Sequence, residues 1–540
     1  MTRLKPSTIK IGRRYRANRL DGQYDAVVIG SGIGGLTTAA LLSEMGWKVC
    51  VLEQHYTAGG YTHSYDRNGY EWDVGVHYIG DMGAKTQARQ MFDFISADKL
   101  KWAPMDDEYD RFYIGDKVFS AMAGKKKFRE NLINRFPTEK AAVDGYMKLL
   151  DAVGKGIPAY SMSKLLKPWQ RAIAAPFLKL KIPKLLFRNT YEVLSELTDN
   201  QDLIAVICGQ WGDMGLPPKR STFMVHAMIA RHYMHGGFYP IGGSWTIAES
   251  IIPQIQKTGG DVFTYAQVER IVLDGNSVTG VEMADGHHIE CACVISSAGA
   301  ENTFSRLLPK EAVAKAGYDH LLEKVKPSIA HLGVYIGLKH PAKELNLPKT
   351  NFWIYADNDS DAAVERFLGD PDAPFPAVYI SFPSAKDPDY ERRHPGTSTI
   401  EIVAPAPIEW FEKWQGTTWG KRGDDYDAFK AQLGERLMEY LYEKMPHLEG
   451  KVDYYEVSTP LSTEHFCAYQ HGELYGLDHD PVRLQQNWLG PHTRFKGLWL
   501  TGQDVLTCGV TGAMMAGLLT TSAIIGWRKS PGLLKRIFGA

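Results

Sequence analysis

The chain of 540 residues is 44% apolar and 23% charged, with a formal net charge of −1 at pH 7. This length predicts two to four structural units around a large core. The near-neutral charge argues against nucleic acid as a partner, and no apolar run reaches the ~18–20 residues that a membrane-spanning helix needs. The six cysteines are scattered without metal-ligand spacing, which predicts a reduced compartment and no metal site.

A basic extension, residues 1–22, opens the chain with seven Lys/Arg against one Asp and without an apolar signal-peptide core. The apolar run 24–29 then predicts a buried parallel strand, 36–45 a helix and 48–52 a second strand. This strand–helix–strand order is typical of units that bind dinucleotides.

Three glycines and one acid supply the chemistry of this unit. Gly30, Gly32 and Gly35 form a GxGxxG sequence between the first strand and the helix. Gly30 allows a tight turn, Gly32 lets a pyrophosphate approach the backbone, and Gly35 lets the helix pack on the strand. Glu53, at the end of the second strand, can accept hydrogen bonds from ribose hydroxyls. Together these residues predict a dinucleotide site.

The stretch 152–191 has an unusual charge pattern. It contains eight Lys/Arg, no Asp or Glu, and many interleaved apolar side chains such as Trp169 and Phe177. This composition is typical of a segment that lies on a membrane surface. The alternative is an ordinary solvated helical face over a core, broken by internal prolines.

Two later segments are predicted to complete the nucleotide-binding domain. The first has a predicted helix over 245–257, followed by strands over 261–264, 267–274, 278–283 and 288–295. The second has a strand over 498–501 and then a helix rich in small residues. Two long insertions separate these segments, one mostly helical (85–235) and one mixed (301–480), with strand-like runs at 328–339 and 377–383. We expect the insertions to fold together as a second domain.

Several motifs carry a resemblance to a known family. They are EQH at 53–55, GG at 59–60, EWDVGVHYIG at 71–80, TPLS at 459–462, YGLD at 475–478 and TGQDVLTCGVTGA at 501–513. In these motifs the chain resembles the retinol saturase family, part of the phytoene desaturase and carotenoid isomerase group of FAD proteins. The resemblance implies that FAD, and not NAD, occupies the first dinucleotide site.

The resemblance also implies which residues hold FAD. They are Gly30, Gly32, Gly34, Gly35, Glu53, Gln54, Gly59, Gly60, Val268, Gly502, Asp504, Val510, Thr511 and Ala513. In this interpretation Val268 contacts adenine through its main chain, and Asp504 accepts a ribityl hydroxyl. Asp504 would also suit the N-cap of the helix that follows it.

The predicted fold class is α/β: a discontinuous Rossmann-type FAD-binding domain with an inserted α+β substrate-binding domain, similar to amine oxidases and phytoene desaturases. The FAD-binding domain would comprise 23–84, 236–300 and 481–530. The other predicted units are the extension 1–22, a largely helical substrate and membrane-contact region 85–235, a mixed-sheet substrate domain 301–480, and a basic tail 531–540.

The resemblance implies an oxidoreductase that adds two hydrogens across one C=C bond of a retinoid- or carotenoid-like polyene. Flavin N5 would deliver hydride to one carbon, and a protonatable group would serve the other. The candidates are His77, then Tyr78 and His235. His77 comes first because both the family motif and its glycine-rich context point to it.

Other functions remain open at this stage. Related folds also desaturate or isomerise carotenoids or unsaturated fatty acyl chains, and a carrier of lipids or prenyl groups could use the same fold without catalysis. The sequence contains no second complete unit for NAD(P)H, so NAD(P)H or a quinone are candidate external redox partners. Peripheral attachment on the cytoplasmic side of a membrane is the expected location.

Overall fold

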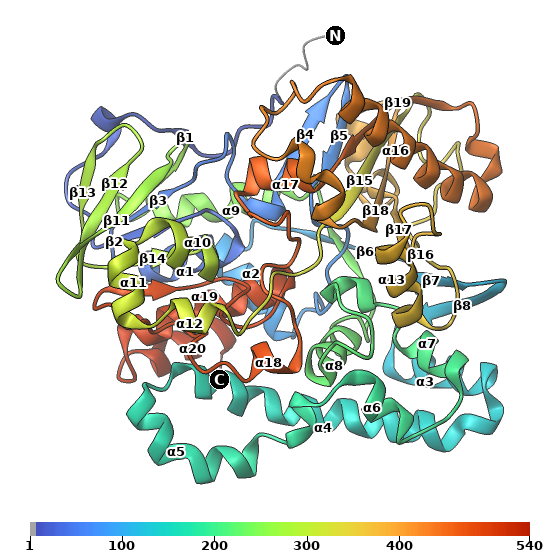
Figure 1. The fold of residues 1–540 in the computed structure, drawn as a ribbon, viewed down its shortest axis with the longest axis horizontal. Helices are drawn as coiled ribbons and strands as arrows, with labels where there is room; N and C mark the ends of the chain where they lie inside the picture. Colours follow the sequence, from blue (N-terminus) through green and yellow to red (C-terminus); the bar gives the residue numbers. More distant parts are fainter. Residues whose placement is uncertain (1–6, 540) are drawn as a thin grey trace.

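The nucleotide-binding part is built around a six-stranded parallel sheet (Figure 1). The structure, a computed structural model, describes residues 7–539. The strand order is β1-β10-β3-β2-β14-β20, and all neighbours run parallel. The strands are β1 Arg13–Arg14, β2 Ala26–Ile29, β3 Val49–Leu52, β10 Asp261–Thr264, β14 Val294–Ser296 and β20 Leu498–Leu500. Distant segments of the chain therefore meet in one sheet, which confirms the predicted discontinuous Rossmann-type domain.

Alternate side chains of β2 pack into different layers. Ala26 and Val28 join a core formed with helices, while Val27 and Ile29 face the other side. This period of two is expected for a strand buried on both faces. The helices on the first side are α1 Ile33–Glu44, α2 Gln87–Ser96, α9 Trp245–Gln256, α19 Gly509–Ile525 and α20 Ser530–Phe538.

A three-stranded antiparallel sheet covers the opposite face. It consists of β11 Val268–Asp274, β12 Ser277–Met283 and β13 His288–Glu290. The single strand expected over 288–295 is wrong, because the chain leaves this sheet after β13 and enters the parallel sheet as β14. Cys291 and Cys293 lie in or beside that break.

The second domain has a seven-stranded mixed sheet of order β19-β15-β18-β17-β16-β7-β8, in which only β16 and β7 pair in parallel. Helix α16 packs on it through buried leucines such as Leu437. The strands are β7 Glu108–Ile114, β8 Lys117–Met122, β15 His331–Leu338, β16 Asn351–Tyr355, β17 Ala377–Ser381, β18 Ser398–Pro405 and β19 Val452–Ser458; α13 is Ser360–Gly369, α16 Asp424–Lys444 and α17 Pro460–Cys467.

Residues 85–235 are less uniformly helical than expected. They contain β6 Trp102–Pro104, which pairs with β9 Phe238–Pro240, and the hairpin β7–β8, which extends the large sheet. The hairpin buries alternate residues around a turn at Gly115, whose φ is +54°. The helices follow in a layer along the lower edge of Figure 1: α3 Lys125–Arg135, α4 Lys140–Leu165, α5 Pro168–Lys181, α6 Thr190–Ser195, α7 Gln201–Ile207 and α8 Phe223–His232.

Both predicted tails pack on the nucleotide-binding part. The extension is described from residue 7 onward and contributes edge strand β1; residues 1–6 lie outside the described residues, as does Ala540. Helix α20 forms most of the tail and buries Leu533 and Ile537. Between residues 7 and 539, none of the helices combines the length and apolar character needed to cross a bilayer.

Candidate active site

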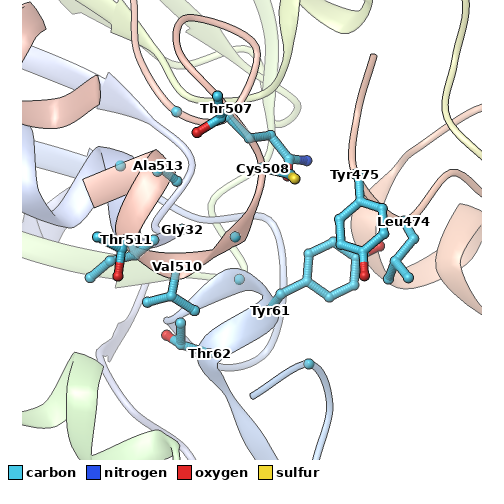
Figure 2. A pocket seen from close by; sticks show the side chains of 18 of the residues that line it. Gly32, Tyr61, Thr62, Leu474, Tyr475, Thr507, Cys508, Val510, Thr511 and Ala513 are labelled. Atoms are coloured by element: carbon cyan, nitrogen blue, oxygen red, sulfur yellow. The ribbon is translucent and has the colours of Figure 1, made fainter. Parts of the chain in front are cut away.

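One continuous cavity of about 810 Å³ connects the two domains. It begins at the carboxyl ends of β2 and β3, where parallel α/β sheets place their ligands, and continues beneath the segment 507–513 (Figure 2). Its far part is lined by aromatic side chains from the large sheet and from residues 211–233, and it also reaches helix α4.

The first glycine loop leaves room for a phosphate group. Gly30 adopts a φ of +94°, which turns the chain sharply from β2 toward α1. A Cβ built on Gly32 would meet no atom within 4 Å, although Gly32 lines the cavity at the N-terminus of α1. A free space in front of a helix N-terminus fits an anionic pyrophosphate. Gly35 does not line the cavity; its Cβ would lie 2.3 Å from the Gly30 carbonyl oxygen, so it serves the helix–strand packing.

The second glycine pair packs directly on the first loop. Gly59 and Gly60 have φ values of +125° and +56°, and a Cβ on Gly60 would lie 2.8 Å from the Gly32 Cα. Both glycines line the cavity. Glycine at these two positions therefore lets the backbones of the two loops touch at the edge of the cavity.

A second helix N-terminus, that of α19, points at the cavity from the other end of the chain. Val510, Thr511 and Ala513 line it, and Gly34 and Gly502 approach so closely that a Cβ on Gly34 would lie 2.7 Å from the Gly502 Cα. The buried hydroxyl of Thr511 has no hydrogen-bond partner within the described chain. An unpaired polar atom beside free helical N–H groups fits a bound dinucleotide.

Glu53 is buried at the end of β3 and faces the cavity with Gln54 and Val268. Its carboxylate accepts hydrogen bonds from the backbone and side chain of Ser31 and from the His55 backbone. A carboxylate has about four acceptor positions, so capacity for a ribose hydroxyl remains. These residues fit the adenosine end of FAD.

Asp504 does not line the cavity, so the structure gives no support to the ribityl contact predicted for this residue. Its two carboxylate oxygens accept hydrogen bonds from the backbone N–H groups of Ala300, at 2.8 Å, and Leu477, at 3.1 Å. It does not cap the following helix either, because the N-cap of α19 is Cys508. Asp504 ties three chain segments together, and its neighbour Gln503 lines the cavity instead.

His77 and Tyr78 line the cavity, and each is backed by a buried carboxyl group. His77 Nδ1 and Glu401 Oε2 share a hydrogen bond of 2.9 Å, and the Tyr78 hydroxyl donates to Asp110 at 2.8 Å. Burial, reinforced by nearby Lys386, lowers the pKa of His77 to about 3, so its ring is neutral. Burial raises the pKa of Glu401 well above its usual range.

His235 is exposed and lies outside the cavity lining, so its prediction as a catalytic residue is wrong. The chain turns away from the site after α8, because the glycines at 236 and 237 lead into β9. The histidine that lines the cavity from this helix is His232, whose Nε2 accepts a hydrogen bond from the Gly80 backbone at 2.8 Å.

Sequence reasoning missed several cavity residues. Asp213 is the one acidic residue in the sequence GQWGDMG. An acidic residue among glycines and apolar residues is a pattern from which this site residue could have been predicted. The aromatic lining had no comparable signal, since tyrosine and tryptophan on strands also suit an ordinary core. The missed cavity residues are Trp211, Asp213, Trp353, Tyr379 and Tyr475.

Comparison with known proteins identifies the family. A model described as "NAD(P)-binding Rossmann-like domain" matches residues 28–95. Human all-trans-retinol 13,14-reductase is 39% identical over 542 residues, covering 95% of this chain and 87% of the human protein. The chain belongs to the all-trans-retinol 13,14-reductase family. This is the retinol saturase family that the motifs resemble, so that prediction is confirmed.

More distant matches place this reductase family in a wider group. Prolycopene isomerase from Daucus carota is 24% identical, covering 92% of this chain and 79% of the isomerase. Among solved structures, putrescine oxidase bound to putrescine superposes with a TM-score of 0.59 at 16% identity, covering 93% of this chain and 99% of the oxidase. That likeness confirms the fold class.

Proposed function

We propose that this protein is an FAD-dependent saturase that reduces one C=C bond of a retinoid- or carotenoid-like polyene. Membership of the reductase family makes it an oxidoreductase. The observation that carries the proposal is the single cavity, which joins the dinucleotide loops to a chamber walled by aromatic rings. A cofactor at one end and a long apolar ligand at the other would therefore meet inside the protein.

FAD would be held by the two glycine loops, by Glu53 and by the N-terminus of α19. When bound and reduced, the flavin supplies a hydride at N5. The residues proposed to contact FAD are Gly30, Gly32, Gly34, Glu53, Gln54, Gly59, Gly60, Val268, Gly502, Val510, Thr511 and Ala513, all of which line the cavity. Gly35 and Asp504 would support the site by packing.

The chamber is suited to a flat, apolar substrate. The rings of Tyr78 and Tyr233 stack with their centroids 4.2 Å apart, and Trp353 lies 4.5 Å from Tyr379. These rings bury apolar surface and hold fixed planes that exclude water from the reacting double bond. The protein's part in the reaction would be to orient the polyene and keep the site dry.

The direct test uses the purified, yellow holoprotein reduced with dithionite without oxygen. Adding all-trans-retinol should restore the oxidised flavin spectrum and give a product two mass units heavier, as the formula requires when two hydrogens add to one double bond. Reduced flavin that stays reduced in the presence of retinoids and carotenoids would contradict saturation.

The isomerase alternative rests on the match to prolycopene isomerase. Isomerisation would change the chromatographic position of a carotenoid without changing its mass or the net flavin spectrum. Desaturation, of carotenoids or of fatty acyl chains, would reduce oxidised flavin instead. A carrier function would leave both ligand and flavin unchanged.

We also propose that helix α5 lies on an anionic membrane surface. Trp169, Ile173, Phe177 and Leu180 are spaced along one side of the helix, and between 59% and 81% of each residue is exposed. Exposed lysines at 179, 181 and 184 accompany this stripe. Apolar side chains flanked by cations fit anionic headgroups, which favour the cytoplasmic leaflet.

The cavity reaches Gly154, Ile157, Pro158 and Ser161 on the preceding helix α4. A polyene dissolved in the bilayer could therefore enter without crossing water. We propose that residues 85–235 and 301–480 together form this substrate domain, and that NAD(P)H or a quinol outside the chain reloads the flavin.

Membrane contact is tested by sedimentation with anionic liposomes. The triple variant Lys179→Gln, Lys181→Gln, Lys184→Gln should leave more protein in the supernatant. A matched control removes exposed Lys413, Lys421 and Lys451, which precede or follow α16 in the sequence, and should sediment like the wild type. Equal sedimentation of all three proteins would contradict the proposal.

A further inference from the structure

Asp213 lines the cavity from a short turn, η5 Trp211–Met214. The Tyr475 hydroxyl donates to the Gly212 carbonyl at 2.9 Å, and Cys508 Sγ lies 3.5 Å from the Asp213 carbonyl as a thiol donor. Tyr475 and Cys508 both appear in Figure 2, on the wall of the proposed flavin site. These two contacts fix Asp213 beside that site.

The Asp213 carboxyl group is poorly solvated. One of its oxygens, Oδ2, is buried and has no hydrogen-bond partner among residues 7–539. Burial and the charge of Asp110 act to raise its pKa, and the Tyr78 hydroxyl acts to lower it. The titratable groups that face it are Tyr78, Tyr109, Asp110, Tyr233, Tyr355, Tyr379, Tyr475 and Cys508.

Asp110, whose charge acts on Asp213, lies in different surroundings. Asp110 accepts hydrogen bonds from Tyr78, Gln210 and Asn351, at 2.8 to 2.9 Å, and Asn351 in turn binds Lys386. Burial raises the pKa of Asp110 to about 6, and these donors limit that rise by stabilising its negative charge. Burial, and then the charge of Asp110, raise the pKa of Asp213 well above its usual range. Unequal environments of this kind separate the roles of paired carboxyls.

We propose that Asp213 is the catalytic acid that gives the substrate its proton. This inference rests on the proposed saturase function. One carbon of the alkene would receive the hydride that reduced flavin supplies, as the π bond breaks. The π electron pair would form the second C–H bond with the carboxyl proton of Asp213, which would become a carboxylate while the flavin returns to its oxidised form. Solvent then returns the proton once the product has left.

His77 and Tyr78 are less suited to this step. The His77 ring is neutral, and a neutral imidazole is a far weaker acid than a carboxyl group. Tyr78 already donates its hydroxyl proton to Asp110, and burial raises its pKa well above the usual range. Both residues therefore position the polyene and the Asp110 carboxylate, while Asp213 carries the transferable proton.

The test begins with apoprotein, without cofactor. Infrared difference spectra of wild type against Asp213→Asn at pH 7 should show one additional protonated carboxyl in the wild type. Retinol binding, followed by quenching of tryptophan fluorescence, should be similar in both proteins, because the amide keeps the size of the side chain. An identical carboxyl spectrum in the two proteins would overturn the inference.

The second measurement is single-turnover reoxidation of the dithionite-reduced holoprotein by the polyene. Asp213→Asn should slow flavin reoxidation by about 10²–10⁴-fold, the usual contribution of a general acid. The wild-type rate should decline at high pH, where Asp213 loses its proton, and this decline should be absent in Asp213→Asn. Asp213→Glu should restore part of the rate. A matched control, Asp361→Asn, alters a buried carboxyl of α13 outside the cavity and should keep the wild-type rate.

The outcomes separate the two proposals. If wild type and Asp213→Asn are reoxidised equally fast, Asp213 is not the acid, and the saturase function stands. If the polyene does not reoxidise the wild type, the saturase function fails, and the role of Asp213 fails with it. Should Asp213→Asn not fold, Asp213→Glu and Asp213→Ser carry the same comparison.

Discussion

Single glycines around the cavity differ in what a side chain would meet. At Gly32 an added methyl group would enter open space, at the position proposed for the pyrophosphate. At Gly35 it would collide with a backbone oxygen 2.3 Å away. One glycine would therefore serve the proposed ligand, whereas the other is required by the fold, although both belong to the same GxGxxG motif.

The substitution Gly32→Ala should spare the apoprotein and weaken FAD binding. We expect a change in apoprotein stability within about 1 kcal/mol, because Gly32 has an ordinary negative φ and serves only as an N-cap. FAD affinity should fall about tenfold or more, or ~1.4 kcal/mol. Calorimetry of apoprotein and a flavin-fluorescence titration measure the two effects.

Gly35→Ala is the matched comparison. Overpacking against the backbone should cost the apoprotein about 1–3 kcal/mol. If Gly32→Ala bound FAD as tightly as the wild type, the proposed place of the pyrophosphate would be wrong.

The residues that sequence reasoning placed well are those whose role depends on local backbone. Glycine loops and a strand-terminal acid such as Glu53 act through their own turn, so a motif is sufficient to place them. Asp504, His235 and Asp213 depend on how remote segments pack: Asp504 is drawn toward Ala300 and Leu477, and Asp213 reaches the cavity only because its turn docks on Tyr475 and Cys508. No local pattern contains that information.

At the scale of elements, helices α1 and α19 both have their N-termini at the cavity. Their packing is close: Gly517 of α19 lies where a Cβ would be 2.8 Å from the Gly34 carbonyl oxygen and 2.8 Å from the Thr37 Cβ. Thr38 and Thr501 hydroxyl groups share a hydrogen bond of 3.0 Å beside it. The distance between the two helices therefore depends on one small residue.

Gly517→Ala should lower the melting temperature and weaken FAD binding together, because it pushes apart two helices that both contribute to the proposed FAD site. Gly532→Ala in α20 is the control, since its Cβ would meet no atom within 4 Å; alanine there should be neutral or slightly stabilising. Differential scanning fluorimetry with and without FAD measures both. A normal FAD affinity in Gly517→Ala would contradict the coupling.

Elements with a simple hydrophobic pattern were predictable. The structure has β10 at the predicted residues, and β2, β3 and α9 within two residues of theirs at each end. The pattern failed where tertiary pairing decided the outcome. The run 288–295 is apolar enough for one strand but serves two sheets, and β7–β8 join a sheet whose other strands lie more than 200 residues later.

For the whole molecule, buried histidines make folding sensitive to acid. Burial lowers the pKa of six of them to about 3 or 4: His55, His63, His77, His226, His232 and His331. Between the ordinary value of 6.5 and these lower values, the unfolded chain binds more protons than the folded protein. The free energy of unfolding therefore falls as the pH falls through this range.

His226 allows this to be tested away from the proposed site of reaction. It is buried on α8, where its Nε2 and the Tyr146 hydroxyl share a hydrogen bond of 3.0 Å, and it does not line the main cavity. Between pH 6.5 and 5, the free energy of unfolding of His226→Gln should depend less on pH than that of the wild type. The two slopes should differ by up to ~1.4 kcal/mol per pH unit. Urea unfolding at the two pH values measures the slope.

Exposed His320 is the control, and His320→Gln should keep the wild-type slope. If His226→Gln also kept it, the acid sensitivity would have another origin.

The order of strands in the parallel sheet has a consequence for biosynthesis. Glu53 is synthesised long before the N-terminus of α19, which begins at residue 509. At about 5–20 residues per second, roughly half a minute to a minute and a half separates the two events. Before residues 509–513 have been synthesised, the proposed FAD site lacks the side formed by the N-terminus of α19. The proposed FAD can therefore be bound from both sides only after this segment has been made.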